Sequence, residues 1–342
     1  MTASPQSPAR KLLDLIDGAW AAQAIHVAAE LRLPELLAEK PRTSDDLALA
    51  TGTHPLALRQ LLRALATIDV LRQREDGAFE TTPLGQRLEA EHPDSVRAWA
   101  LWSGAHLWPV WGDLAYSVRT GGSARSRRLG TEGFAHLERD PAAGALFQRA
   151  AAELTRLDAA GILAAYDFST VRCVADLGGG SGELLARILA ANPALQGVLF
   201  DLPHAAEAGR SQLRQAGVAN RCRVVSGDFF ERAPEGADLH LLKSVIHDWS
   251  DEDCLRLLRS VRRALGGTGR LLVIERVVPE RLENAAAHRR LAHSDLTMLV
   301  ALGSRERTES ELRGLLVGAG YRIRRVLPTR SSFSILEAET VP

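Results

Sequence analysis

The spacing of apolar residues changes about half-way along the chain. Up to about Tyr166, apolar side chains recur every three or four positions, which is typical of helices that bury one face. After Asp167, short apolar runs alternate with helical patterns, which predicts a parallel sheet with helices on both faces. We therefore expect an α/β fold with a helical domain over residues 1–166 and a sheet domain over residues 167–342.

The first predicted helix carries a wide apolar stripe. The spacing predicts one long helix whose stripe consists of Leu12, Leu13, Ile16, Trp20, Ala24, Ile25, Val27, Ala28 and Leu31. Such a stripe packs either into the core of its own chain or against a second copy of the chain, and the sequence pattern is compatible with both.

A winged-helix-like pattern follows this stripe. Residues 43–50 predict a capped short helix, Leu56–Leu71 a second helix and residues 77–83 a short strand pair. Winged helices often bind DNA. The second helix offers only Arg59 and Arg63 as cations, whereas a DNA reader usually makes more phosphate contacts. We expect a structural or dimerising role, with DNA binding as the less favoured alternative.

The second half predicts five strands, the helices between them and a terminal hairpin. The strand-like runs are Cys173–Leu177, Gly197–Asp201, Cys222–Ser226, Leu239–Ile246 and Leu271–Glu275. The helical patterns between them include Glu183–Ala191, Ala205–Ala216 and Asp251–Leu265, and the hairpin comprises Tyr321–Val326 and Phe333–Ala338.

The segment 176–182, DLGGGSG, joins the first of these strands to a helix. Glycines allow a sharp turn and bring backbone N–H groups close to a ligand, and the helix N-terminus favours negative charge. A dinucleotide fingerprint requires glycine at the sixth position from Gly178, where this chain has Glu183. The spacing therefore favours a nucleotide-type ligand without a pyrophosphate.

The next two strands also end in polar residues. Asp201 ends the second strand, where a carboxylate accepts hydrogen bonds from both ribose hydroxyls. Asp228 and Phe229 follow the third strand, where they would meet the amine and the face of an adenine. The alternative is that both aspartates only cap helices. Because ligands of open α/β sheets bind beyond the carboxyl ends of the strands, we expect a cofactor site there.

His247 directly follows the fourth strand, at the same edge of the sheet. Ser250 and Asp253 predict a capping box for the next helix. Phenols ionise near pH ~10, so histidine, with a pKa near ~6.5, is a natural general base for them. Glu275 and Glu306 are candidates to orient the ring and stabilise its charged form. The alternative for Glu306 is a surface ion pair with its neighbouring arginines.

Charge and composition exclude several other classes of protein. The 342 residues include 42 Lys and Arg and 42 Asp and Glu, so no net charge attracts the chain to nucleic acid or anionic lipid. The three cysteines have no metal-ligand spacing, which predicts no structural zinc. The N-terminus lacks the apolar core of a signal peptide, and the apolar stretches are too short to span a bilayer. We expect a cytoplasmic protein with no membrane and no nucleic-acid partner.

The motifs DLGGGSG, FDLP, GDFF, LLKSVIHDWSDEDC, VIERVVPE and SRERT occur in this order. The chain thereby resembles the caffeate-type small-molecule O-methyltransferases, including bacterial phenazine methyltransferases, from about Leu12 to its C-terminus. The resemblance implies a Rossmann-like methyltransferase sheet and an N-terminal dimerisation domain that forms a homodimer. It also implies S-adenosylmethionine as cofactor, S-adenosylhomocysteine as product and no metal.

The resemblance also assigns roles to individual residues. The implied cofactor-binding residues are Asp176, Gly178, Gly179, Gly180, Asp201, Leu202, Gly227, Asp228, Phe229, Lys243 and Ser244. The implied catalytic residues are the base His247 and its supporting acids Glu275 and Glu306. The candidate acceptor residues are Asp248, Asp295, Met298, Phe147 and Ala151, together with Trp108, for which buried packing is an equal alternative.

These observations predict methylation of a hydroxyl on a small aromatic molecule, a phenazine or another polycyclic phenol. The family often has a methionine where this chain has Ala151, and the smaller side chain leaves room for a fused tricycle. Nitrogen acceptors need no base, so His247 favours oxygen. The alternatives are a relative that uses bound S-adenosylmethionine for hydroxylation or decarboxylation, and a DNA-binding regulator.

Overall fold

The computed structural model describes residues 7–267 and 269–341 and contains two compact units, Met1–Pro109 and Val110–Pro342. The boundary differs from the expected one at residues 166 and 167. Helices between residues 110 and 165 belong to the second unit, because α9 (Ala124–Leu129) packs on α15 (Ala286–Leu302), and α11 (Pro141–Ala165) packs on α12 (Glu183–Ala191). Helical periodicity shows local structure and does not show which core a helix joins.

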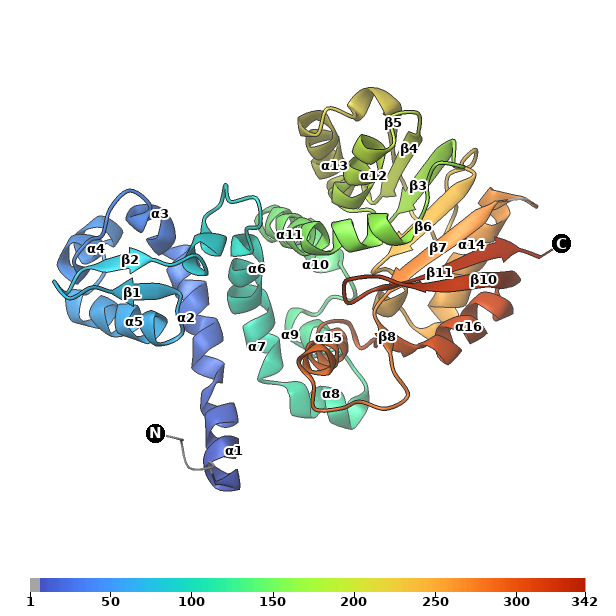
Figure 1. The fold of residues 1–342 in the computed structure, drawn as a ribbon. Helices are drawn as coiled ribbons and strands as arrows, with labels where there is room; N and C mark the ends of the chain where they lie inside the picture. Colours follow the sequence, from blue (N-terminus) through green and yellow to red (C-terminus); the bar gives the residue numbers. More distant parts are fainter. Residues whose placement is uncertain (1–6, 268, 342) are drawn as a thin grey trace. The chain divides into compact units, whose positions relative to one another are not determined.

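The first unit is helical with one small hairpin (Figure 1). Its elements are α1 (Pro8–Asp17), α2 (Ala19–Glu30), α3 (Leu33–Leu37), α4 (Ser44–Thr51), α5 (Pro55–Thr67), β1 (Leu71–Gln73), β2 (Phe79–Thr81), the 3-10 helix η1 (Gly85–Leu88), α6 (Arg97–Trp102) and the π-helix η2 (Ser103–Leu107). The short helix α7 (Trp108–Trp111) crosses the boundary between the units. The expected capping box at α4 is present, formed by Thr43 and Asp46.

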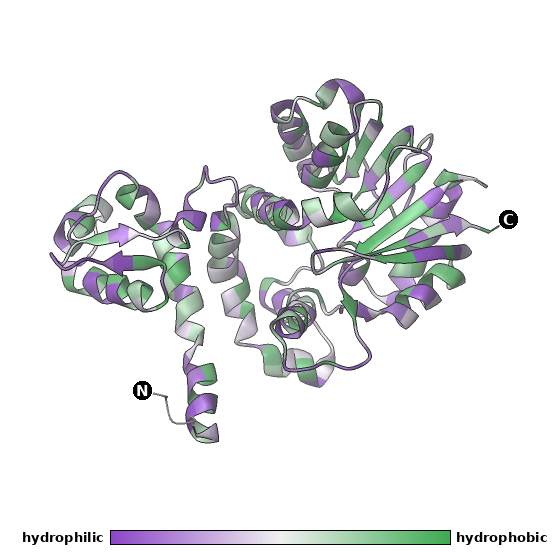
Figure 2. Ribbon diagram, viewed as in Figure 1, coloured by the Kyte–Doolittle hydropathy of each residue, from purple (hydrophilic) through white to green (hydrophobic). Residues whose placement is uncertain are grey.

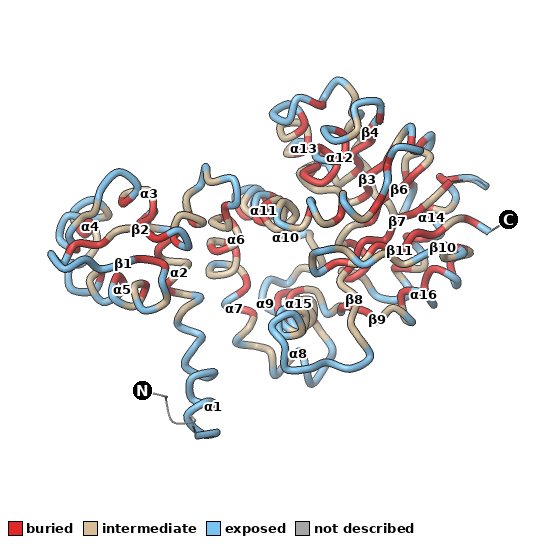
Figure 3. The backbone as a smooth tube through the Cα atoms, viewed as in Figure 1, coloured by how far each residue is buried: buried red, intermediate tan, exposed pale blue. Residues whose placement is uncertain are grey.

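The apolar stripe at the N-terminus divides into two parts with different surroundings. Gly18 separates α1 from α2, so the expected single long helix is wrong. In α2, Ala24 and Ala28 join the core of the first unit. In α1 none of the residues is buried, and the helix is exposed along its length in Figure 3. The α1 part of the stripe, Leu12, Leu13 and Ile16, therefore has no role in the core of this chain.

The second unit is built on a seven-stranded sheet. Its elements are α8 (Leu114–Thr120), α9, α10 (Ala135–Arg139), α11, β3 (Cys173–Leu177), α12, β4 (Gln196–Asp201), α13 (Pro203–Gln215), η3 (Ala219–Arg221), β5 (Cys222–Ser226), β6 (Leu239–Lys243), η4 (Ile246–Asp248), α14 (Asp251–Leu265), β7 (Arg270–Glu275), β8 (Val277–Val278), α15, β9 (Arg307–Thr308), α16 (Glu309–Gly318), β10 (Tyr321–Pro328) and β11 (Ser334–Thr340). The strand order is β10-β11-β7-β6-β3-β4-β5. Strands β3 to β7 are parallel, and the expected terminal hairpin joins β7 antiparallel, so the sheet is mixed.

Alternating side chains of the sheet enter two hydrophobic clusters. Leu177, for example, packs in one cluster with α14 and α16, whereas Val174 packs in the other with α11 and α12. The strands mix hydrophobic and hydrophilic residues in Figure 2, and the outer strand β10 carries three arginines. Because both faces are covered, the carboxyl ends of the strands remain as the edge that can bind a ligand. β3 pairs with both β4 and β6, so the chain reverses its direction of travel across the sheet at β3.

Strand β6 ends earlier than the sequence pattern predicts. The apolar run continues to Ile246, but the strand stops at Lys243, and Ile246–Asp248 forms the 3-10 turn η4. Ser244 has a left-handed backbone with φ of 55°, which a non-glycine residue rarely adopts. This turn directs the following segment along the edge of the sheet.

The helices within residues 7–267 and 269–341 include none with the length and apolar character needed to cross a membrane. The cytoplasmic location expected from the sequence stays a prediction.

Candidate active site

The glycine segment after β3 forms a close backbone turn. Gly178, Gly180 and Gly182 all have left-handed backbones, with φ values of 66°, 56° and 74°. A Cβ atom on Gly178 would lie 3.0 Å from the Val245 side chain, and one on Gly180 would lie 2.9 Å from Gln148 Oε1. Only glycine fits these positions without strain. The segment therefore brings bare backbone to the ligand edge of the sheet.

Asp201, at the end of β4, faces this turn. Its Oδ2 atom accepts a hydrogen bond from the Gly180 N–H at 2.7 Å, and its Oδ1 atom accepts one from the Leu202 N–H at 2.7 Å. A carboxylate offers about four lone-pair sites, so both oxygens retain capacity for ligand hydroxyls. Asp201 is thus more than a helix cap, because its carboxylate links two of the predicted cofactor-binding segments.

The segment after β5 lies beside the same turn. The Asp228 carboxylate accepts a hydrogen bond from the Phe230 N–H at 2.8 Å, which is a local turn contact. A Cβ atom on Gly178 would lie 3.4 Å from Phe229 Cε1, so this ring adjoins the glycine segment. Gly227 packs against Phe200 so closely that a Cβ atom would lie 2.8 Å from its ring. The three predicted strand ends therefore converge.

Two buried charged groups lie beneath this edge. Burial, together with the nearby Asp201 carboxylate, raises the pKa of Asp176 to about 7. Burial lowers the pKa of Lys243 to about 8, with a contribution from Arg276. The Lys243 Nζ atom donates a hydrogen bond to Thr155 Oγ1 at 3.0 Å. Perturbed pKa values of this kind are common at functional sites.

His247 is buried in η4 and its Nδ1 atom faces two glutamates. Nδ1 lies 3.2 Å from each carboxylate oxygen of Glu306 and 3.4 Å from Glu275 Oε2. On the other side of the ring, Nε2 lies 3.4 Å from Asp248 Oδ1. Because ionised carboxylates only accept hydrogen bonds, Nδ1 carries a proton in the neutral as well as the charged ring.

The carboxylates control the charge of this histidine. Burial opposes the imidazolium, but Glu275, Asp248 and Glu306 outweigh it and raise the pKa of His247 to about 9. Burial likewise raises the pKa of Asp248 to about 7, and His247 opposes that increase. The cluster therefore holds His247 largely protonated at neutral pH and makes it a stronger base than free histidine.

Each glutamate is fixed by further hydrogen bonds. Glu275 Oε1 accepts from the N–H groups of Val245 and Ile246 at 3.0 and 2.8 Å, which anchors the turn after β6. Glu306 Oε1 accepts from the Ser294 hydroxyl at 2.7 Å.

Glu275 and Glu306 lie 31 positions apart in the sequence, and the parallel pair β8–β9 explains why they meet. It aligns the segment after Glu275 with the segment after Glu306. The cluster is therefore a product of tertiary pairing.

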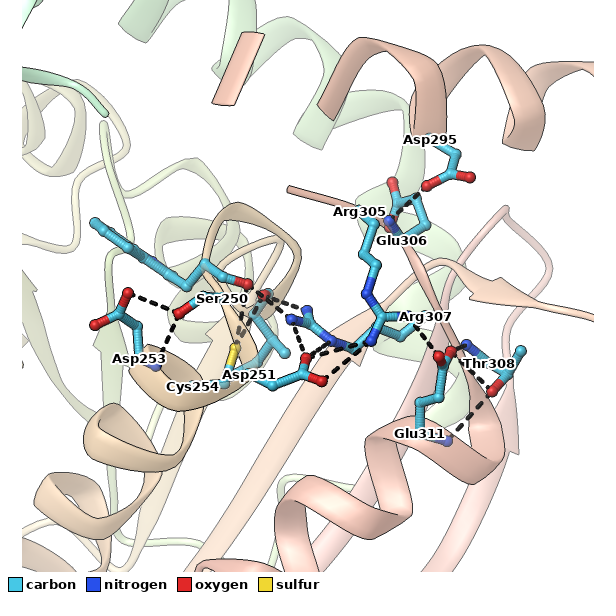
Figure 4. Close-up of polar contacts among 12 residues, drawn as sticks. Ser250, Asp251, Asp253, Cys254, Asp295, Arg305, Glu306, Arg307, Thr308 and Glu311 are labelled. Carbon is cyan, nitrogen blue, oxygen red and sulfur yellow. Dashed lines mark hydrogen bonds and ion pairs between the residues drawn. The ribbon is translucent and has the colours of Figure 1, made fainter. Parts of the chain in front are cut away.

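The arginines flanking Glu306 bind elsewhere, so the surface-pair alternative for this glutamate is wrong. Arg305 reaches Asp251 and Glu311, and Arg307 reaches Asp251 and two backbone carbonyls (Figure 4). Glu306 itself is only 3% exposed.

The buried Arg307 guanidinium holds both ends of the segment that carries His247. It donates to the carbonyl oxygens of Ile246 at 2.8 Å and Trp249 at 2.7 Å, and to Asp251 Oδ1 at 2.7 Å. Ser250 caps α14 through the Asp253 N–H at 3.1 Å. The return bond of the expected capping box differs, because Asp253 accepts from the Ser250 hydroxyl instead of its backbone.

The candidate acceptor residues have different surroundings. Asp295, on α15, accepts a hydrogen bond from the Glu306 N–H at 2.8 Å, so it supports the histidine cluster (Figure 4). Met298 is half-buried on the same helix. Phe147 and Ala151 are half-buried on α11, where Phe147 lies 5.8 Å from the Phe134 ring. Trp108 is 42% exposed and belongs to the first unit.

Three residues of this site were missed in the sequence analysis. Arg307 had been considered only as a partner for Glu306, and Thr155 and Gln148 lie inside a helix without any motif of their own. A polar residue at helical spacing from apolar neighbours indicates a buried polar side chain. The sequence does not show which neighbouring element such a side chain faces. The positions of Thr155 and Gln148 follow from the packing of α11 against α12 and α13.

Two family models match this chain. The O-methyltransferase domain matches residues 111–322, and the O-methyltransferase dimerisation domain matches residues 13–90. The chain belongs to the O-methyltransferase family. The catalytic match begins next to the start of the second compact unit at Val110.

Relatives and solved structures agree with this assignment. The chain is 39% identical to the phenazine O-methyltransferase PhzM of Lysobacter antibioticus, over 96% of each chain. It is 42% identical to the mitomycin biosynthesis 6-O-methyltransferase of Streptomyces lavendulae, over 96% of this chain and 93% of the relative.

A crystal structure of NcsB1, an O-methyltransferase from neocarzinostatin biosynthesis, also matches. It contains S-adenosylmethionine and 2-hydroxy-5-methyl naphthoic acid. The two structures superpose with a TM-score of 0.83 and share 33% sequence identity. The match covers 99% of this chain and all of the NcsB1 chain. The enzyme described here is therefore an S-adenosylmethionine-dependent O-methyltransferase.

The residues present fit this cofactor. The glycine turn leaves backbone exposed where a Cβ atom would collide with Val245 or Gln148. The Asp201 carboxylate lies next to that turn, and the buried Lys243 ammonium lies beneath it. A ligand with hydroxyls, an amine and a carboxylate finds complementary groups at this edge of the sheet.

Proposed function

We propose that this enzyme methylates a hydroxyl of a small polycyclic aromatic molecule, with His247 as the general base. The observation that carries the proposal is the placement of His247 Nδ1 between Glu306 and Glu275. This placement keeps a proton on Nδ1, so that in the neutral ring Nε2 has a free lone pair. A hydroxyl at Nε2 can transfer its proton there.

The acid–base match supports this role. A phenol ionises near pH ~10, and the pKa of His247 is raised to about 9. A base whose pKa approaches that of the acceptor takes the proton at little cost in free energy. General base catalysis of this kind typically contributes roughly 10²–10⁴-fold in rate. Asp248, 3.4 Å from Nε2, stabilises the imidazolium that results.

Bound S-adenosylmethionine supplies an electrophilic methyl group on a positively charged sulfur. His247 accepts the hydroxyl proton while the acceptor oxygen bonds to the methyl carbon and the carbon–sulfur bond breaks, with its electron pair staying on sulfur. We propose that Asp201 holds the ribose hydroxyls and that Asp228 and Phe229 hold the adenine. The remaining predicted cofactor residues shape the same site, namely Asp176, Gly178, Gly179, Gly180, Leu202, Gly227, Lys243 and Ser244. Holding donor and acceptor in line supplies much of the rate enhancement.

The proposed acceptor class is a fused-ring phenol. Relatives named for a phenazine and for mitomycin are 39% and 42% identical to this chain, and NcsB1 binds a naphthoic acid. Ala151 is a small residue on α11, one helical turn after Phe147, which favours a broad, flat acceptor. We propose Asp248, Met298, Phe147 and Ala151 as acceptor contacts, with Asp295 acting through Glu306. The role of Trp108 stays a prediction.

We also propose a homodimer formed through the first unit. The dimerisation model matches residues 13–90, and Leu12, Leu13, Leu15 and Ile16 of α1 are exposed. A contiguous apolar helix face of this kind is typical of a protein interface.

Product analysis tests the proposed function. Purified enzyme is incubated with methyl-labelled S-adenosylmethionine and a panel of hydroxyphenazines, hydroxynaphthoates and monocyclic phenols. Mass spectrometry and NMR then locate the methyl group. We expect a methyl ether on a polycyclic acceptor. Methylation only at nitrogen, or oxidised or decarboxylated products without methyl transfer, would contradict the proposal.

A further inference from the structure

Gln148 is a buried polar residue on α11 that faces the glycine turn. Its side chain is part of a residue only 8% exposed. A Cβ atom built on Gly180 would lie 2.9 Å from its Oε1 atom, too close for a side chain there, so the amide oxygen adjoins the bare backbone of the turn. Gly180 is also the residue whose N–H group donates to Asp201. Gln148 therefore adjoins the predicted cofactor edge from the helix side.

The Oε1 atom of Gln148 has no hydrogen-bond partner among the residues that the structure describes. Buried amide oxygens are nearly always hydrogen-bonded, because leaving one unpaired forfeits its hydration without compensation. An orphaned acceptor beside a ligand-binding turn indicates that a donor on the ligand completes it.

Gln148 lies on a capped and well-packed helix. Helix α11 starts at Pro141, and the Asp140 carboxylate caps it through the N–H groups of Ala142 and Ala143 at 3.1 and 3.0 Å. The same helix packs on α12, which begins directly after the glycine turn, and on α13. The distance between Gln148 and Gly180 is therefore set by the packing of α11 on α12.

The chemistry of the cofactor selects the donor. S-Adenosylmethionine carries hydrogen-bond donors at three places: the adenine amine, the ribose hydroxyls and the α-ammonium of its methionine part. The first two are matched by Asp228 and Asp201 in the proposed arrangement. The ammonium needs an acceptor at the remaining end.

On α11, Thr155 lies seven residues after Gln148 and holds the Lys243 ammonium at 3.0 Å. Cationic and hydroxyl groups of this type suit the methionine carboxylate, whereas an amide oxygen suits the ammonium.

We propose that Gln148 Oε1 binds the α-ammonium group of the cofactor's methionine part. The inference depends on the cofactor of the family and on the proposed roles of Asp201 and Asp228, and it does not depend on His247 as base. It adds a residue inside α11 to a cofactor site otherwise drawn from strand ends.

Ligand binding tests this proposal without any turnover. Isothermal titration calorimetry measures the dissociation constants of S-adenosylhomocysteine and of 5′-methylthioadenosine, which lacks the amino-acid part. Gln148→Met keeps the length of the side chain and removes the acceptor. We expect this variant to raise the dissociation constant of S-adenosylhomocysteine about 10- to 100-fold, as for a lost hydrogen bond to a charged group. The dissociation constant of 5′-methylthioadenosine should change less than about twofold. Gln215→Met, at an exposed position on α13, is the matched control and leaves both constants unchanged.

A second variant decides which charged group is bound. Gln148→Glu places a carboxylate beside the ammonium, so we expect it to retain S-adenosylhomocysteine binding within about threefold. A larger loss in Gln148→Glu than in Gln148→Met would mean that the side chain meets the methionine carboxylate, which overturns the proposal. Equal weakening of both ligands in Gln148→Met, or no weakening of either, would overturn it as well.

Discussion

The Nδ1 atom of His247 lies 3.2 Å from both carboxylate oxygens of Glu306. This contact fixes the proton on Nδ1 and raises the pKa of the ring. Replacing Glu306 by Gln removes the charge and allows the amide to donate to Nδ1, which favours the wrong tautomer. We expect Glu306→Gln to lower kcat about 10- to 100-fold while the affinity for S-adenosylhomocysteine is unchanged. Glu309→Gln, at a partly exposed position in the first turn of α16, is the control. Unchanged kcat in Glu306→Gln would contradict this role.

The pH dependence of the reaction follows from the raised pKa of His247. The base must be neutral at Nε2, and Glu275, Asp248 and Glu306 raise its pKa from 6.5 to about 9. The neutral fraction therefore grows as the pH rises towards 9, and kcat/KM for a weakly acidic phenol increases over the same range. In Glu306→Gln this rising limb moves to lower pH, because one of the raising charges is lost. A wild-type profile that is flat between pH 6.5 and 9 would argue against His247 as the base.

Arg307 is predicted to stabilise the His247 segment. Its guanidinium makes the shortest hydrogen bonds to the carbonyl oxygens of Ile246 and Trp249, so Arg307→Met leaves these buried oxygens only longer contacts, such as those from the Cys254 thiol. We expect a loss of about 2–3 kcal/mol in the free energy of unfolding, measured by chemical denaturation, and a lower kcat. We expect Arg307→Lys to recover little of the lost stability, since one ammonium group does not reproduce the planar, multiple-donor guanidinium.

Arg305→Met is the matched control for that change. Its guanidinium binds Asp251 and Glu311 on the surface, where an exposed ion pair contributes less than about 1 kcal/mol. Equal destabilisation by Arg305→Met and Arg307→Met would show that burial of Arg307 is unimportant.

The cluster of His247, Glu275 and Glu306 also has the spacing of a metal site, because one nitrogen or oxygen atom from each side chain lies within 4.8 Å of the other two. A metal requires a deprotonated imidazole, whereas the pKa of His247 is raised to about 9. The Ser294 hydroxyl already donates to Glu306 Oε1. We therefore expect prolonged EDTA treatment to leave kcat within about twofold. Loss of activity that a divalent cation restores would contradict the metal-free mechanism.

The sequence predicts the parts of this fold that depend on local pattern. The strand Cys173–Leu177, the helix Asp251–Leu265 and the glycine turn between the first strand and its helix all occur as expected. Each is determined by residues close together in the chain. The domain boundary differs from the predicted one because helices α8–α11 have the same periodicity as those of the first unit, yet belong to the second unit, where α8 and α9 pack on α15 and α11 packs on α12 and α13.

The candidate site was predictable as a set of residues but not as a geometry. The order of motifs identified His247, Glu275 and Glu306, but only the pairing of β8 with β9 explains their contact. The end of β6 was missed because the apolar run continues through a turn that Glu275 stabilises from another strand. Gln148 had no motif at all, since its significance lies in the helix packing that aims it at Gly180.

The central claim, that His247 takes the acceptor proton, is tested most directly by varying the acidity of the acceptor. Initial rates of wild type and His247→Ala are compared on two related polycyclic acceptors, one with a hydroxyl pKa near ~10 and one carrying an electron-withdrawing group that lowers it below neutral pH. Affinity for S-adenosylhomocysteine is measured in parallel. We predict a loss of at least about 100-fold for the weakly acidic acceptor and less than about tenfold for the ionised one, with unchanged affinity. Equal losses for both acceptors, or no loss for either, would contradict the account.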